Sequence, residues 1–113
     1  MRTVTLEVSS REKIGHRFLR ACEGEAQGAF ISFETPALLF KVLSAKRWEL
    51  LKVMTGAGPM DIREAAFRLG RDEKGVHGDV AALLKAGVLQ KTDKDLIVFP
   101  FDAVHVDFML KAA

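Results

Sequence analysis

The sequence predicts a single α+β domain, with strands near both ends of the chain and a helical middle. Residues 3–8 and 104–111 alternate apolar and polar side chains, which is typical of a strand with one buried face. Between them, several stretches repeat apolar residues at helical spacing, and two strand-like runs surround a polar tip at residues 92–95. A chain of 113 residues is large enough for one modest core.

Composition and charge exclude several classes of protein. Apolar residues make up 49% of the chain and the net charge is +2, as in ordinary globular domains. No apolar run approaches the roughly 20 residues of a membrane-spanning helix, and the first ten residues lack the apolar stretch of a secretory signal. The single cysteine, Cys22, lies on an apolar helical face and fits a reducing compartment. We therefore expect a cytoplasmic protein without membrane association.

The first part of the chain predicts strand, helix and strand in that order. After the first strand, Ser9 and Glu12 have the spacing of a helix capping box. Apolar residues at helical spacing then predict a helix over residues 10–23. A second strand is expected at residues 29–34, where two phenylalanines supply bulk that favours strands.

The middle of the chain predicts two helices, and the sequence leaves open whether they are continuous. Thr35 followed by Pro36 has the pattern of an N-cap and a first-turn proline. Ser44 can cap a further helix that runs to residue 54. The residues expected to face inward from this further helix are Trp48, Leu51 and Met54.

Two short helical patterns, joined by a tight turn, come next along the chain. The first starts at Asp61, which has capping-box spacing to Glu64, and Gly70 ends it. Asp72 can cap the second pattern, and Gly87 occupies the position of a left-handed helix end. The apolar residues expected to face inward are Ile62, Ala65, Ala66 and Leu69 in the first pattern and Val76, Val80, Leu83 and Leu84 in the second.

Two strand-like runs, residues 88–91 and 96–99, then predict a hairpin with a polar tip. Pro100 ends the second run. The terminal strand can pair with the first strand of the chain or with another copy across a dimer interface, and the sequence leaves both alternatives open.

The order of these helices and the hairpin resembles the winged helix-turn-helix of small prokaryotic transcriptional regulators of the MarR/ArsR kind. The resemblance is carried by DIREAAFRLGR (61–71) and VHGDVAALLKAGVL (76–89). KRWELL (46–51) and VFPFD (98–102) resemble a little-characterised group of predicted regulators of this class. The match covers roughly residues 36–110.

The resemblance divides the chain into two parts that form one compact unit. Residues 1–35 are expected to be a strand–helix–strand extension used for dimerisation. Residues 36–113 are expected to be a winged helix-turn-helix DNA-binding domain with a C-terminal strand. The implied partner is double-stranded DNA, read through the major groove by the helix that follows Gly70.

Candidate DNA contacts follow from this assignment. Those expected on the outer face of the second helix, where side chains can reach base edges, are Arg71, Lys74, His77 and Gly78. Those expected to contact phosphates are Arg63 and Arg68, the hairpin residues Lys91 and Lys94, and Lys46 and Arg47 on the supporting helix. Gly75 and Gly78 each destabilise a helix by about 1 kcal/mol relative to alanine. Their presence on the outer face is explained if another molecule approaches the helix backbone closely. The alternative is an ordinary solvated face balanced by nearby acidic residues.

Catalysis and metal binding are not expected. The chain has no Gly-rich phosphate loop, H-E-x-x-H motif or nucleophile elbow, so we expect neither an enzyme nor a cofactor. His16, His77 and His105 lack metal-ligand spacing, and one cysteine cannot supply the ligands of an ArsR-type metal sensor.

The sequence therefore predicts a homodimeric, sequence-specific DNA-binding regulator that represses transcription by occlusion. A dimer is expected because one such module reads only a few base pairs. The alternative is a protein-interaction module, such as the antitoxin of a toxin–antitoxin pair, which would bind a protein partner and could also regulate its own gene.

Overall fold

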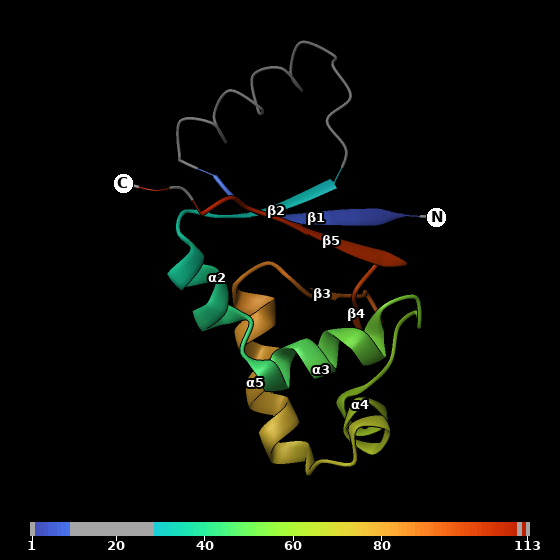
Figure 1. The fold of residues 1–113 in the computed structure, drawn as a ribbon. Helices are drawn as coiled ribbons and strands as arrows, with labels where there is room; N and C mark the ends of the chain where they lie inside the picture. The colour runs from blue at the N-terminus through green and yellow to red at the C-terminus, as the bar shows by residue number, and fades with distance from the viewer. Residues whose placement is uncertain (1, 10–28, 111, 113) are drawn as a thin grey trace.

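The computed structural model describes residues 2–9, 29–110 and 112 and shows an α+β domain with a sheet at one end and helices below it (Figure 1). In chain order, the described elements are β1 (Thr3–Val8), β2 (Ala29–Phe33), α2 (Pro36–Val42), α3 (Ala45–Met54), α4 (Ile62–Leu69), α5 (Glu73–Lys85), β3 (Gln90–Lys91), β4 (Ile97–Val98) and β5 (Ala103–Asp107). The helix predicted over residues 10–23 lies outside the described residues. No helix in the described part of the chain is both long and apolar enough to cross a bilayer.

The three longer strands form a parallel sheet in the order β2-β1-β5. The register pairs Leu6 of β1 with Ile31 of β2 on one side and with Val106 of β5 on the other. Val4 and Leu6 are fully buried, as expected for one face of an alternating strand. The strands predicted near the two ends of the chain therefore pair with each other.

The core lies between this sheet and the helices. The largest side chains that are fully buried in it are Phe99, Leu6, Leu39, Leu43, Leu50, Leu51, Met54, Leu83, Leu89, Val4, Val76 and Val80. Ala65 and Ala66 are buried where α4 lies against α3 and α5, and their small size permits this close contact. The inward faces predicted for α3, α4 and α5 are confirmed, since every apolar residue predicted to face inward from these helices is buried or partly buried in the core.

Side-chain caps fix where three helices begin. Thr35 Oγ1 accepts a hydrogen bond from the Leu38 N–H at 3.1 Å, and Asp61 Oδ1 accepts one from the Glu64 N–H at 2.7 Å. Asp72 caps α5 in the same way. The reciprocal half of the predicted capping box is not formed at α4, because the Glu64 carboxylate accepts a hydrogen bond from Arg68 instead.

The hairpin and the last strand are shorter than predicted. At the hairpin, apolar residues at the strand ends pack into the core instead of extending the sheet, whereas the residues after β5 stay exposed. Val88, Leu89 and Phe99 are buried beside the two-residue strands β3 and β4. β5 ends at Asp107, after which the Phe108 ring packs edge-on against Phe40 of α2 with centroids 5.9 Å apart.

Candidate nucleic-acid interface

The turn between α4 and α5 sets the direction of α5. Gly70 adopts the left-handed conformation (φ 66°) that ends α4, and the Arg71 N–H then bonds back to the Ala66 carbonyl at 3.1 Å. Asp72 caps α5 immediately afterwards. Since Val76 and Val80 are buried, the opposite side of α5 is turned outward.

The β3–β4 hairpin is held beside the start of α4. Met60 and Ile97 exchange two backbone hydrogen bonds, of 2.9 and 2.8 Å, and thus connect the hairpin to the residue before the α4 cap. At the tip, Asp95 adopts a left-handed backbone (φ 63°). Lys91 and Lys94 are exposed on this hairpin.

Two adjoining surface hollows connect the outer side of α5 with the hairpin. The first, of about 410 Å³, is lined by His77 and Ala81 of α5 and by Lys91 and Asp95 of the hairpin, among others. The second also includes His77 and extends to Lys74. We call the exposed residues Lys74, His77, Gly78 and Ala81 of α5 and Lys91 and Lys94 of the hairpin the α5–hairpin face; of these, Lys74, His77, Ala81 and Lys91 line the two hollows.

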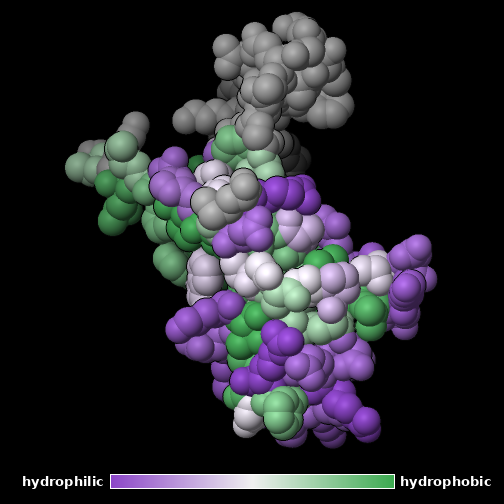
Figure 2. Space-filling view, turned by 90° about the vertical axis from the view of Figure 1, so that its right-hand side faces the viewer, coloured by the Kyte–Doolittle hydropathy of each residue, from purple (hydrophilic) through white to green (hydrophobic). Residues whose placement is uncertain are grey.

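Three residues predicted to contact bases are exposed on this face. Lys74, His77 and Gly78 recur at helical spacing on the outer side of α5. Within the described part of the chain, neither Lys74 nor Lys94 forms an ion pair. Figure 2 shows that hydrophilic residues dominate the lower, helical end of the face it views.

Arg71 is not on the outer face, so that expectation was wrong. Its Nη2 atom lies 2.9 Å from Asp79 Oδ2, and Arg47 Nε lies 3.1 Å from Asp79 Oδ1. The two arginine side chains are 25% exposed and that of Asp79 is 15% exposed. Arg47 also donates to the Val42 carbonyl at 2.9 Å, so it is not a free cation of the supporting helix either. We call Arg47, Asp79 and Arg71 the ion-pair triad.

Asp79 was missed by the sequence-based reasoning, although the sequence contains a signal for it. Position 79 lies three residues after Val76 and four before Leu83, so it shares the apolar side of α5. A carboxylate in such a place needs cationic partners, because burying an unpaired charge is costly. The two arginines are those partners.

The other predicted phosphate contacts are exposed, and three of them form surface ion pairs. Arg63 pairs with Glu73 at 3.4 Å, Arg68 with Glu64 at 2.8 Å and Lys91 with Asp95 at 3.1 Å. Lys46 is exposed at the start of α3. Pairs of this kind contribute at most about 1 kcal/mol, so a phosphate can replace the carboxylate at little cost.

The two glycines of α5 differ in their surroundings. At Gly75, an added Cβ would lie 3.0 Å from Asp72 Oδ1 and 3.3 Å from Arg71 Nη2. Neighbouring side chains of the same molecule therefore explain why a glycine occupies this position. At Gly78, an added Cβ would meet nothing within 4 Å. Only Gly78 therefore leaves room on the outer face for another molecule to approach the backbone.

Replacing Gly78 with alanine is expected to raise the free energy of unfolding by about 1 kcal/mol, because alanine favours the helix and meets no obstacle there. Gly75→Ala is the matched control, in which the contacts with Asp72 and Arg71 are expected to remove most of this gain. Urea unfolding of both variants measures the difference. Equal gains at the two positions would contradict this account of Gly75.

Comparison with known proteins supplies the family. A family model described as HVO_A0114 matches residues 42–106, more than half of the chain. The chain belongs to the HVO_A0114 family. The HVO_A0114 match includes the ion-pair triad and the whole α5–hairpin face, whereas β1 and β2 lie before it. No curated protein and no solved structure matches the chain.

Proposed function

We propose that this protein is a sequence-specific regulator that binds double-stranded DNA through a winged helix-turn-helix. In this assignment α4 and α5 are the helix-turn-helix, α5 is the recognition helix and the β3–β4 hairpin is the wing. The observation that carries the proposal is the α5–hairpin face, where exposed cationic and imidazole side chains on one helix continue onto hairpin lysines. The resemblance to MarR/ArsR-type regulators points to the same function.

Each group on this face has a distinct role in the proposed complex. Lys74 and His77 donate hydrogen bonds to base edges in the major groove, and Gly78 lets the α5 backbone approach the DNA closely. Arg63, Arg68 and Lys91 exchange their surface carboxylates for phosphates, and Lys94 of the wing contacts a phosphate directly. The ion-pair triad does not contact DNA; it positions α5 relative to α3. A homodimer of this kind would repress transcription by covering its site.

Steep salt dependence is the expected signature of this function. Four phosphate contacts per subunit (Arg63, Arg68, Lys91 and Lys94) predict a slope of about −3.6 in log affinity against log salt concentration, since each contact contributes about −0.9. Affinity for a duplex selected from the source genome should therefore fall by about 150-fold per subunit between 50 and 200 mM salt. Fluorescence anisotropy with a labelled duplex measures the slope.

The matched variant is Lys91→Ala/Lys94→Ala, which should make the slope less steep by about 1.8 per subunit. An affinity that does not change with salt, or a genomic selection that retains no duplex, would overturn the proposed function.

A protein-interaction module is the second candidate, and one exposed side chain favours it. Phe67 on α4 is 81% exposed, and a DNA contact does not require a large aromatic group at that place. Large exposed apolar groups often mark protein interfaces. A partner protein bound through Phe67 would remain bound at high salt, so the salt titration separates the two candidates.

A further inference from the structure

β5 is an edge strand whose outer edge has no strand neighbour within the described part of the chain. An exposed edge presents unpaired N–H and C=O groups to other chains, and proteins usually protect it with lysine or proline. The five residues Ala103–Asp107 contain neither. His105, Val106 and Asp107 are all exposed.

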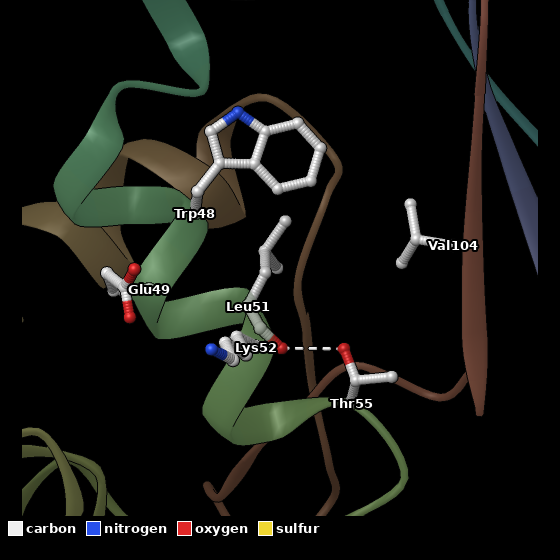
Figure 3. A pocket seen from close by; sticks show the side chains of 6 residues that line it. All are labelled: Trp48, Glu49, Leu51, Lys52, Thr55 and Val104. Carbon is white, nitrogen blue, oxygen red and sulfur yellow. Dashed lines mark hydrogen bonds between the residues drawn. The ribbon is translucent and has the colours of Figure 1, made fainter.

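A hollow of about 460 Å³ lies between α3 and this strand (Figure 3). Trp48 and Leu51 line it from α3, and Val104 points into it from β5. Thr55, whose hydroxyl donates to the Leu51 carbonyl at 2.6 Å, lines its lower end. Glu49 and Lys52 also line the hollow, but most of its surface is apolar, so the hollow suits an apolar side chain.

Exposed apolar side chains continue beyond the hollow along β5, to the residues that follow it and to α2. Val106 is 43% exposed, and Phe108, Met109 and Phe40 are exposed as well. Figure 2 shows apolar residues projecting to one side at the sheet end of the molecule. A contiguous group of this kind marks a protein interface.

We propose that β5 pairs antiparallel with β5 of a second copy, about a two-fold axis that passes through Val106 perpendicular to the sheet. The two sheets would then join into one of six strands. Such an axis keeps each residue on the same face of the sheet in both copies. Directly opposed residues of an antiparallel pair also share a face, so the axis passes through a residue and not between two, which allows only every second register.

The side chains select the register centred on Val106. In it, His105 lies opposite Asp107 of the second copy, and this donor–carboxylate pair occurs twice. An axis at Asp107 would set two carboxylates against each other, and an axis at His105 would set two imidazoles against each other. With the axis at Val106, β5 of one molecule is therefore complementary to β5 of the second molecule.

The same register provides an occupant for the hollow. When the pairing extends the strand by one residue beyond Asp107, Phe108 of the second copy lies opposite Val104, on the face of the sheet that covers the helices, and its ring gives up the edge contact with Phe40. The Phe108 ring then lies at the mouth of the hollow and buries apolar surface on both copies.

The axis also keeps both helical layers on one side of the joined sheet. Since α4 and the start of α5 lie at the end of the molecule away from the sheet (Figure 1), both α5–hairpin faces would lie on the same side of the joined sheet, where one duplex could reach them, a consequence that rests on the proposed function.

Disulfide trapping tests the register directly. In a Cys22→Ser background, Val106→Cys places two cysteines opposite each other with Cα atoms about 5 Å apart, within the range of a disulfide. His105→Cys is the matched control, because its two copies would be about 8 Å apart, beyond that range. We expect the first variant to form a covalent dimer under mild oxidation and the second to remain uncrosslinked. Equal behaviour of the two variants would overturn the register.

Charge exchange gives a second test that uses the intact chain without oxidation. His105→Glu should weaken dimerisation about tenfold in sedimentation equilibrium, because it sets two carboxylates opposite each other, and His105→Glu/Asp107→Lys should restore it. A wild-type protein that is monomeric at tens of micromolar, or a dimer unaffected by these variants, would overturn the pairing. Neither test uses DNA, so failure of the pairing is distinguishable from failure of the proposed function.

Discussion

Replacing Asp79 with alanine is expected to lower the free energy of unfolding by about 2–3 kcal/mol. The carboxylate accepts hydrogen bonds from both Arg47 and Arg71, and each arginine side chain is 25% exposed. Removing it leaves two partly buried cations without their anion. Breaking fully buried pairs costs about 3–5 kcal/mol and exposed pairs at most about 1, so partial exposure places this cost between them.

The surroundings of Arg71 leave it no alternative partner. Its Nη1 atom is buried and has no hydrogen-bond partner within the described part of the chain, so the guanidinium depends on the hydrogen bond that Nη2 donates to Asp79. The triad also connects three segments, α3, the α4–α5 turn and α5. Loss of Asp79 should therefore loosen α5 as well as lower stability.

Urea unfolding with matched variants checks this expectation. Glu73→Ala removes an acidic residue from the same helix, but from an exposed pair with Arg63, and should change stability by less than about 1 kcal/mol. Arg47→Ala and Arg71→Ala should be non-additive with Asp79→Ala in double-mutant cycles. A cost for Asp79→Ala no larger than that of Glu73→Ala would show that the triad is only a surface feature.

The sequence predicts the helices of this fold well, because local signals determine them. Asp61, Asp72, Gly70 and Gly87 mark the ends of α4 and α5 by side-chain capping and left-handed backbone, which act within a few residues. The sequence left open whether the terminal strand pairs with the first strand or with another copy, since the two strands are about a hundred residues apart; the structure pairs β1 with β5. The sequence showed two half-buried strands, and only the tertiary structure reveals that they are neighbours.

The site was predicted less completely, for the same reason. Exposure of Lys74 and His77 follows from helical spacing alone, and the structure agrees. The burial of Arg71 depends on Asp79, eight residues further along, and on Arg47 from another helix. An isolated arginine near a helix start gives no sign that a tertiary partner holds it away from solvent.

Lys74→Ala/His77→Ala is expected to weaken binding to the selected duplex by roughly 150-fold, or about 3 kcal/mol, while leaving folding stability nearly unchanged. Each side chain that contacts a base contributes about 1–3 kcal/mol, and both are exposed in the free protein. The loss should be largest for the selected sequence and small for unrelated duplexes, because base contacts carry the specificity.

The control for this variant is Lys85→Ala, which removes one positive charge from the other end of α5. Lys85 lines a separate hollow beside Phe33 and Leu38, close to the sheet, and is not part of the α5–hairpin face. It should change duplex affinity by less than about threefold, because a remote exposed charge acts only through screened attraction. Equal losses for the two variants would mean that overall charge, and not the outer side of α5, determines binding. A loss specific to Lys74→Ala/His77→Ala, combined with the stability loss specific to Asp79→Ala, would show that α5 binds DNA with one side and is held in place by the other.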